Sequence, residues 1–395
     1  WDVSNVTNMA NMFGGWNGSN FNQDISSWNV SSVTDMSAMF HEAGNFNQDI
    51  SNWDVSSVTE MGYMFRNTGA FNQDLSSWDV SNVESMYEMF AYSNAFNGDI
   101  SNWNVSNVTN MVKLFGYSNF NQNISGWDVS NVTNMSEMFK SNDDFNGDIS
   151  NWDVSNVTDI NNMFNGASTF NQDISGWDVS NVTHMGKLFW SSAFNQDIDG
   201  WNVSNVTFMN GMFRNSTFNQ DISGWNVSNV TNMSGMFRDA SAFNQDISGW
   251  DVSNVTHMAS MFTDASAFNQ DISDWDVSNV TMMTNMFSGI NSLFDENKCA
   301  IHTAFSSNPN WPYNWQEYCP PPTMVTSVEI TGTSGYRFLS SPVSGAIYGD
   351  LLDELWTQGS AGSDMPESSS PNVWTWNNSW NALTDLATDN YTAGS

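Results

Sequence analysis

An aspartate recurs along the sequence in the tetrapeptide Phe-Asn-Gln-Asp and its close variants. If the segments that carry it stack in register, these carboxylates form one column with neighbours about 4.8 Å apart. Carboxylates at that spacing repel by roughly 1 kcal/mol even in water, so hydrogen bonds, raised pKa values or bound cations must offset the repulsion. The column comprises Asp24, Asp49, Asp74, Asp99, Asp148, Asp173, Asp197, Asp221, Asp246 and Asp271.

Two interpretations of this column stay open. Calcium prefers all-oxygen sites, which a row of carboxylates offers. The repeat nevertheless lacks the clustered, alternating Asp ligands and the turn glycines of dedicated calcium-binding repeats. We therefore favour aspartates that cap turns, keep calcium binding as the alternative, and expect no required cofactor.

A second polar column follows the tryptophans, in the motif Trp-(Asp/Asn)-Val-Ser. The serine lies two residues after the acid or amide, so in an extended segment both side chains share one face. Such a ladder can hydrogen-bond a glycan or a protein, and it can equally be a solvated sheet surface. The candidate partner-facing residues are Asp54, Ser56, Asp79, Ser81, Asp128, Ser130, Asp153, Ser155, Asp178 and Ser180.

Catalysis finds little support in the residue types present. The four histidines are His41, His184, His257 and His302, and the two that share a repeat position, His184 and His257, are three repeats apart. That separation, on the order of 14 Å, is too large for one metal ion. The sequence contains no glycine-rich phosphate loop, nucleophile elbow or metal-spaced Cys/His cluster. We expect a protein that is not an enzyme.

The charge balance narrows the choice of partners. Asp and Glu number 42 against 8 Lys and Arg, which gives a formal net charge of −34. Nucleic acids and anionic membrane surfaces repel such a polyanion. No run of about 18 apolar residues is present for direct insertion into a bilayer. The 20 Trp and 27 Phe can instead build a large core.

A repeat supplies the elements that would position these columns. In one copy, Ile50, Trp53 and Val55 indicate a short extended segment, and the apolar spacing within Val58–Phe65 indicates a short helix. So small a unit buries its apolar side chains only against its neighbours, so we predict an α/β repeat solenoid over residues 1–290, with one short strand and one short helix per coil. Twelve copies begin at Trp1, Trp28, Trp53, Trp78, Trp103, Trp127, Trp152, Trp177, Trp201, Trp225, Trp250 and Trp275.

The frame Ile-x-x-Trp-x-Val-Ser, followed by Val-Thr-x-Met-x-x-Met-Phe, resembles the BspA-like leucine-rich repeats. It also resembles the related repeat of about 25 residues in bacterial and Mycoplasma-type surface proteins. In this chain Trp and Met replace most of the leucines of an ordinary leucine-rich repeat. The resemblance implies a leucine-rich-repeat-like fold, exposure at a cell surface or secretion, adhesion and recognition, and no enzymatic activity.

The composition changes sharply after the array, where all eight prolines lie. Residues 291–319 contain the only two cysteines, Cys299 and Cys319, and are typical of a cap over an open solenoid end. A disulfide between them would close a loop worth roughly 3 kcal/mol. For an extracellular chain we favour that disulfide over two reduced, buried thiols.

Two further segments complete the chain. Residues 320–324 indicate a Pro-rich linker, and residues 325–395 indicate part of a β-rich module. The sequence opens at Trp1, inside a repeat, so we expect a piece of a longer protein.

The principal functional hypothesis is an extracellular or cell-surface repeat protein for adhesion or recognition. Its acidic, polar solenoid face would contact a protein or glycan on another surface. A structural spacer or filament subunit without a specific ligand is one alternative, and a calcium-stabilised carbohydrate-binding protein is another. Because uniform columns hide a specific site, we expect ligand contacts where copies deviate: Gly98, Gly147, Asn123, Glu84, Trp16, Tyr92, Tyr117 and Trp190.

Overall fold

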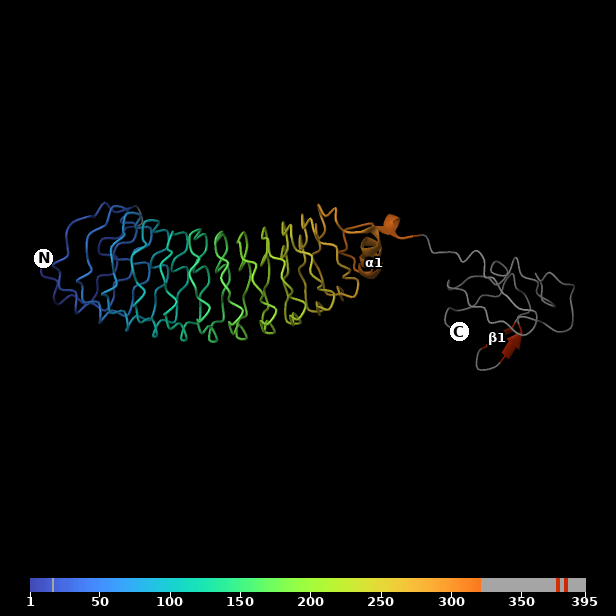
Figure 1. Ribbon diagram of the computed structural model, residues 1–395, viewed down its shortest axis with the longest axis horizontal. Coiled ribbons are helices and arrows are strands. Elements are labelled where there is room, and N and C mark those ends of the chain that lie inside the picture. The colour runs from blue at the N-terminus through green and yellow to red at the C-terminus, as the bar shows by residue number, and fades with distance from the viewer. Residues whose placement is uncertain (16–17, 321–373, 377–379, 383–395) are drawn as a thin grey trace. The chain divides into compact units, whose positions relative to one another are not determined.

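The computed structural model describes residues 1–15, 18–320, 374–376 and 380–382. The chain divides into two compact units, Trp1–Pro321 and Pro322–Ser395. In the first unit the chain winds into a stack of coils, coloured from blue to orange in Figure 1. The stack ends at helix α1 (Asp295–Phe305) and the short 3-10 helix η1 (Gln316–Tyr318). In the second unit, β1 (Trp374–Trp376) and β2 (Trp380–Ala382) pair antiparallel.

One parallel β-bridge joins each coil of the array to the next. The bridging residue is x in the motif Val-Thr-x-Met, so that Glu60 pairs with Asp35 before it and with Ser85 after it. The preceding threonine adds two bonds, because the N–H and Oγ1 of Thr59 donate to the Thr34 carbonyl at 2.9 and 3.3 Å. Eleven such bridges follow one another without a break, and the predicted repeat solenoid is confirmed.

The segment predicted to be extended consists instead of two tight turns. The N–H of Trp53 donates to the Ile50 carbonyl at 3.1 Å, and the N–H of Val58 donates to the Val55 carbonyl at 2.9 Å. All four side chains are buried, because successive corners of the coil turn them toward the interior. The parallel pairing therefore lies after this segment rather than on it.

The helix predicted over Val58–Phe65 is replaced by consecutive turns. The N–H of Tyr63 donates to the Tyr87 carbonyl at 2.7 Å, and that of Phe65 to the Met89 carbonyl at 2.9 Å, in both cases in the next coil. An N–H group used between coils cannot bond four residues back within its own coil. Tyr63 also has a φ of 61°, in the left-handed region, which interrupts a right-handed helix. Within the described part of the array, each coil has one bridge and a series of turns in place of one strand and one helix.

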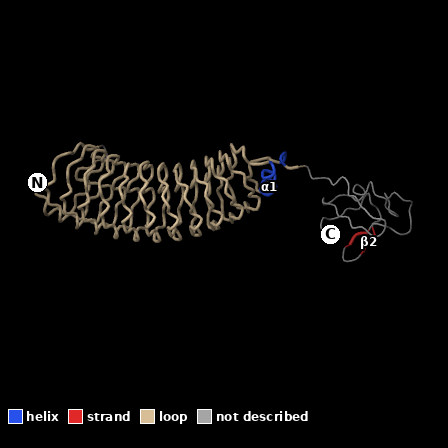
Figure 2. The backbone as a smooth tube through the Cα atoms, viewed as in Figure 1, coloured by secondary structure: helices blue, strands red, loops and turns tan. Residues whose placement is uncertain are grey.

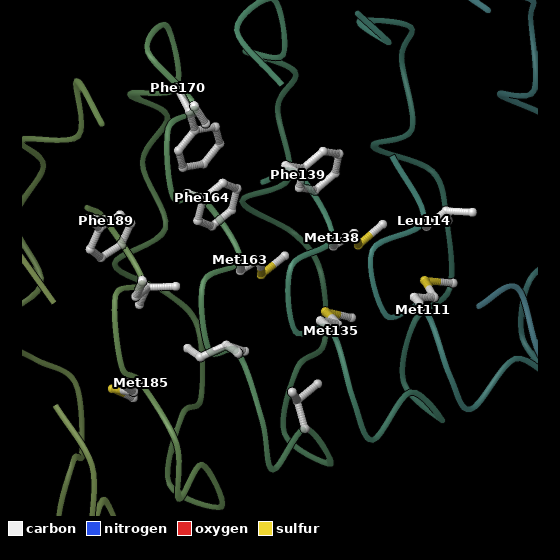
Figure 3. Close-up of a cluster of buried hydrophobic side chains, with 14 of the residues drawn as sticks. Met111, Leu114, Met135, Met138, Phe139, Met163, Phe164, Phe170, Met185 and Phe189 are labelled. Carbon is white, nitrogen blue, oxygen red and sulfur yellow. The ribbon is translucent and has the colours of Figure 1, made fainter. Parts of the chain in front are cut away.

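Aromatic and methionine side chains form columns through the interior. Phe65 stacks on Phe90 of the next coil with ring centroids 5.5 Å apart, and on Phe71 at 4.2 Å. Trp78 and Trp103 lie parallel at 6.4 Å. Figure 3 shows the same methionine and phenylalanine positions recurring from coil to coil. Each coil buries its apolar surface mainly against its two neighbours, which is the arrangement that stabilises a solenoid.

The segment after the array folds over the last coil, with its helices blue in Figure 2. Cys299 and Cys319 form a disulfide with Cα atoms 4.8 Å apart, which confirms the predicted pair. The buried side chain of Asn308 donates from Nδ2 to the carbonyls of Val277 and Val280 at 2.7 and 2.9 Å. The cap therefore satisfies backbone groups that an open end would leave unpaired.

The remaining predictions concern the C-terminal part of the chain. The linker at residues 320–324 and the β module at residues 325–395 lie outside the described residues, except for Pro320, β1 and β2. In the ranges that the structure describes, no helix is both long enough and apolar enough to span a membrane.

Candidate functional site

The first aspartate column caps turns. Oδ1 of Asp49 accepts the backbone N–H of Ser51 at 2.9 Å and its hydroxyl at 2.7 Å. The hydroxyl bond, and then the backbone bond, hold the pKa of Asp49 below its ordinary value, because both favour the ionised carboxylate. An equivalent bond from the N–H two residues later is made by Asp24, Asp49, Asp74, Asp99, Asp148, Asp173, Asp197, Asp221, Asp246 and Asp271.

The turn itself offsets the repulsion within this column. Asn123, which interrupts the row of aspartates, makes the same two bonds with Ser125 at 3.0 and 2.7 Å. A neutral amide that fills the same role indicates that the turn needs an acceptor oxygen rather than a charge or a cation. Among the residues that the structure describes, no three His, Cys, Asp or Glu side chains come together as a group of metal ligands.

The second polar column has the same local geometry. Oδ1 of Asp54 accepts the N–H and the hydroxyl of Ser56 at 3.1 and 2.6 Å, on an exposed corner of the coil. One carboxylate oxygen and the serine hydroxyl therefore bond within the turn. The predicted partner-facing pairs all make the backbone bond: Asp54 with Ser56, Asp79 with Ser81, Asp128 with Ser130, Asp153 with Ser155, and Asp178 with Ser180.

A different part of each coil carries the residues that vary most. We call the residues at 7, 10, 13 and 14 positions after each repeat tryptophan the variable flank. In the coil of Trp78 they are Ser85, Glu88, Ala91 and Tyr92. Position 7 forms the β-bridges, and the N–H groups of alternate residues after it bond to the next coil. Equivalent positions of successive coils therefore lie side by side.

Positive charge in the array is confined to the variable flank. On a chain with a net charge of −34, this placement gives one flank a different character from the rest. The consensus of the twelve copies does not show this clustering of basic residues, because no copy has more than one of them; numbering each basic residue from its repeat tryptophan reveals it. All six basic residues of the array are at position 10 or 13: Arg66, Lys113, Lys140, Lys187, Arg214 and Arg238.

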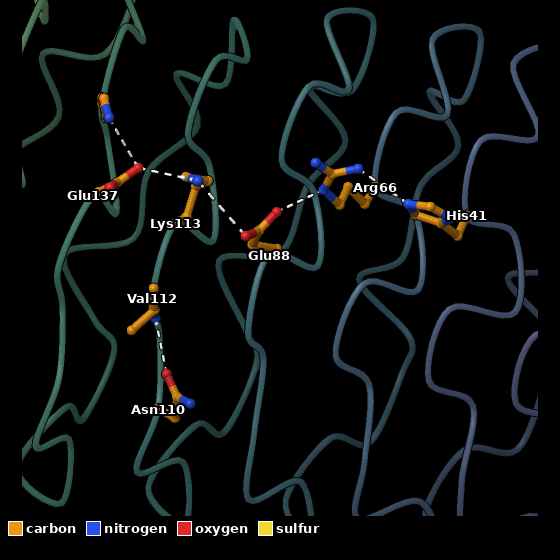
Figure 4. Close-up of polar contacts among 8 residues, drawn as sticks. His41, Arg66, Glu88, Asn110, Val112, Lys113 and Glu137 are labelled. Atoms are coloured by element: carbon orange, nitrogen blue, oxygen red, sulfur yellow. Dashed lines mark hydrogen bonds and ion pairs between the residues drawn. The ribbon is translucent and has the colours of Figure 1, made fainter. Parts of the chain in front are cut away.

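The first three cations belong to a chain of ion pairs that crosses successive coils (Figure 4). Nε of Arg66 lies 2.5 Å from Oε2 of Glu88, and Nζ of Lys113 lies 3.6 Å from Oε1 of the same Glu88. Oε2 of Glu137 lies 3.0 Å from Lys113 Nζ and 3.1 Å from Lys140 Nζ. Each cation therefore has a carboxylate partner.

A buried histidine and two tyrosines complete this network. Nη1 of Arg66 lies 3.0 Å from Nε2 of His41, and since a guanidinium only donates, His41 accepts and is neutral. Burial, and then the Arg66 charge, hold the pKa of His41 below its ordinary value. Tyr92 and Tyr117 stack at 4.6 Å, with Arg66 Cζ 5.0 Å from the Tyr92 ring and Lys140 Nζ 5.6 Å from the Tyr117 ring.

The other three cations form a second cluster, the Trp190 patch, which comprises Lys187, Trp190, Arg214, Arg238 and Asp239. Cζ of Arg214 and Nζ of Lys187 lie 4.5 and 5.3 Å from the centroid of the Trp190 ring. Nε of Arg214 and Nε of Arg238 lie 3.8 and 3.4 Å from Oδ2 of Asp239. Two of the three cations thus share one carboxylate, and the patch has excess positive charge.

The deviating residues named from the sequence divide into two groups. Tyr92, Tyr117 and Trp190 lie in the two clusters of the variable flank. The others do not form a cluster. Gly98, Gly147 and Asn123 lie in the Phe-Asn-Gln-Asp segments of the first aspartate column, and Glu84 takes the threonine position of the Val-Thr-x-Met motif. Trp16 lies outside the described residues.

The remaining histidines lie apart from one another. His184 and His257 both form bridges at position 7, three coils apart, as the repeat spacing predicts. Nδ1 of His302 accepts the indole N–H of Trp311 at 3.0 Å within the cap.

Comparison with known proteins identifies a repeat family. The family model described as "Mycoplasma protein of unknown function, DUF285" matches residues 1–101, 88–193, 116–217 and 190–298. No curated protein matches the chain. Among solved structures, a leucine-rich-repeat protein of Leptospira interrogans aligns at 5% identity and a TM-score of 0.20, covering 71% of this chain and 78% of that one.

Proposed function

We propose that this chain, which belongs to the DUF285 family of Mycoplasma proteins of unknown function, is a surface or secreted recognition protein. In this proposal the solenoid contacts a partner molecule, a protein or glycan on another surface, through its variable flank. The uniform aspartate columns build the coils and keep the array soluble.

The distribution of the cations carries the proposal. Internal ion pairs account for the first three cations, but the last three have a single carboxylate, Asp239, beside them, an excess of positive charge that a spacer would not require. Residues that vary between otherwise uniform copies, on a rigid scaffold, are typical of a recognition surface. Tyr92 and Trp190 add amphipathic aromatic side chains, which are enriched where proteins bind partners.

The Cys299–Cys319 disulfide supports a location outside the reducing cytosol. Adhesion and the BspA-like character of the repeat belong to the same proposal, which they support through the resemblance of the repeat motif to those of bacterial surface proteins.

The proposal is tested with beads coated with the purified chain and a printed array of glycans and purified surface proteins. We expect the beads to bind a subset of the printed spots. A variant with Tyr92→Ala, Tyr117→Ala and Trp190→Ala changes the variable flank, and we expect it to lose that binding. A matched triple variant, with Asp54→Asn, Asp79→Asn and Asp153→Asn, changes the uniform column and retains the turn acceptors, so we expect it to bind like the wild type.

Opposite results would favour other functions. Binding that survives the flank substitutions but is abolished by the column substitutions would place the site on the Asp/Ser ladder. Beads that bind no printed spot, while the chain is folded, would favour the structural spacer.

A further inference from the structure

Among the described residues, the Trp190 patch is a place where cations outnumber their carboxylate partners: Arg214 and Arg238 lie near Asp239 alone, and Lys187 has no ion pair. In the chain of ion pairs through Glu88 and Glu137, by contrast, Arg66 and Lys140 both donate hydrogen bonds to glutamates. The guanidinium groups of Arg214 and Arg238 donate none to any described residue, and Nε of Arg238 is buried without a hydrogen-bond partner. The four Nη N–H donors of each guanidinium therefore remain for an anionic ligand.

Packing against the indole orients one of these cations. Arg214 Cζ is 4.5 Å from the centre of the Trp190 ring, on which Lys187 Nζ also lies. A guanidinium held against an aromatic ring keeps its N–H groups directed outward in one plane, which suits a carboxylate. The side chains of Arg214 and Arg238 are 31% and 38% exposed, so a ligand can reach both.

The cations follow the axis of the stack. Lys187, Arg214 and Arg238 belong to three consecutive coils, those of Trp177, Trp201 and Trp225. Lys187 is at position 10, beside Trp190, whereas Arg214 and Arg238 are both at position 13, so the backbones of the two arginines lie about 4.8 Å apart, as those of adjacent strands do. An extended partner with one negative charge at each regular interval, comparable to the length of a sugar residue, can engage them in succession.

The neighbouring side chains favour a hydroxyl-rich partner. Ser191 and Asn215, at position 14 of two of these coils, bond to each other at 2.9 Å and leave further amide and hydroxyl capacity at the surface. Duplex nucleic acid is less suitable, because its charge density of about one per 1.7 Å exceeds the density of about one cation per coil and would be opposed more strongly by the net charge of −34 than a sparsely charged polymer.

We propose that the Trp190 patch binds a linear acidic polysaccharide that has one carboxylate per sugar residue, with Arg214 and Arg238 as the carboxylate-binding residues. This inference rests on the proposed function and names its partner class. Trp190 acts as a positioning residue for Arg214.

The test is calorimetric titration of the whole chain with polygalacturonate, with its methyl-esterified form as the uncharged control. We expect binding of the charged polymer alone, and weaker binding as salt is added. The double substitution Arg214→Gln and Arg238→Gln should weaken binding about tenfold or more, since charge-assisted bonds are lost. The control Lys298→Gln removes a cation of the cap, outside the variable flank, and should change affinity less than about twofold.

The proposal would be overturned by equal binding of the esterified polymer or by unchanged affinity of a folded double variant. Preferential binding of polyglutamate would also overturn it and would indicate an acidic protein partner. The bead assay distinguishes failure of the polysaccharide proposal from failure of the proposed recognition function. If polygalacturonate does not bind while the beads still require the variable flank, the carboxylate proposal fails and the recognition proposal stands.

Discussion

The indole Nε1 of Trp152 donates a hydrogen bond to the backbone carbonyl of Ile124, one coil earlier, at 3.2 Å. The equivalent bond recurs in ten coils of the array. The repeat tryptophan is therefore both a core side chain and a polar link between coils.

Replacing Trp152 with Phe tests this link. The substitution leaves the Ile124 carbonyl buried without its donor and reduces packing, so we expect the free energy of unfolding to fall by about 2 kcal/mol. Urea unfolding followed by circular dichroism measures the change. Trp28→Phe is the control, because the half-buried Trp28 indole has no hydrogen bond with a described residue. Equal losses in the two variants would contradict a role for the bond.

Glu88 is the buried centre of the ion-pair network. Its side chain is 8% exposed, and it faces Arg66 and Lys113. We expect Glu88→Ala to lower the free energy of unfolding by about 2 to 3 kcal/mol, because two cations lose their partner in a poorly hydrated setting. Glu137→Ala, at the same repeat position but with a side chain 25% exposed, should cost less. A larger loss for Glu137 in chemical denaturation would show that burial does not set the strength of these pairs.

Backbone strain predicts a substitution that increases stability. Ala38 has a φ of 54°, and the equivalent positions of two later coils are Gly211 and Gly235, with φ of 63° and 62°. Glycine adopts this conformation without a steric cost, so Ala38→Gly should stabilise the chain by about 0.5 to 1 kcal/mol. Ala259→Gly, at a position without positive φ, should destabilise it by a similar amount. Thermal unfolding curves of the two variants measure both changes in stability. Changes of the same sign would contradict backbone strain at Ala38.

Acid should weaken the turns of the first aspartate column. The pKa values of Asp49, Asp148 and Asp173 lie below the ordinary value because the following serine donates to each carboxylate. The stabilisation is therefore complete above the unfolded pKa of about 3.9 and is lost as pH falls through the lower folded values.

Substituting all three residues with Asn should flatten the acid side of a plot of stability against pH, since Asn123 shows that an amide caps the turn. The control variant, Asp144→Asn, Asp274→Asn and Glu296→Gln, removes the same number of exposed acids outside this column and should keep the steeper fall. Superimposable curves for the two variants would exclude the turn aspartates as the cause.

Calcium should have no specific effect on the array. The carboxylate repulsion is already offset by bonds within each turn, as the pair Asp24 and Ser26 illustrates. Thermal unfolding with calcium and with chelator, at fixed ionic strength, should give the same midpoint as a magnesium control. A rise specific to calcium would show that the column binds the ion, since a ligand of the native state raises the midpoint.

Much of the architecture could be predicted from the sequence because the solenoid depends on period and burial. Trp53, Val58 and Met61 recur at fixed positions and are all buried, and Cys299 and Cys319 pair as expected. The secondary structure within a coil could not be predicted in the same way. A turn between Ile50 and Trp53 places apolar side chains in the interior as an extended strand or a helix would, and only the hydrogen bonds between coils distinguish these conformations.

The candidate site was predicted only in part. Tyr92, Tyr117 and Trp190 were identified because they interrupt a uniform pattern, but their cationic neighbours were not. Arg66 and Tyr92 belong to different coils and lie 26 residues apart in the sequence, so their contact appears only when the coils are stacked in register.

The bridges between coils also allow the number of repeat units to change by gene duplication. Because the residue that pairs at position 7 ranges from Ser85 to Phe208 without interrupting the ladder, an in-frame duplication of one unit would add a coil whose joins resemble those already present. The inserted copy could then diverge at its outward positions while its interior stayed compatible on both sides. Unequal recombination within such a gene would therefore produce folded variants of different lengths and different surfaces in a single step.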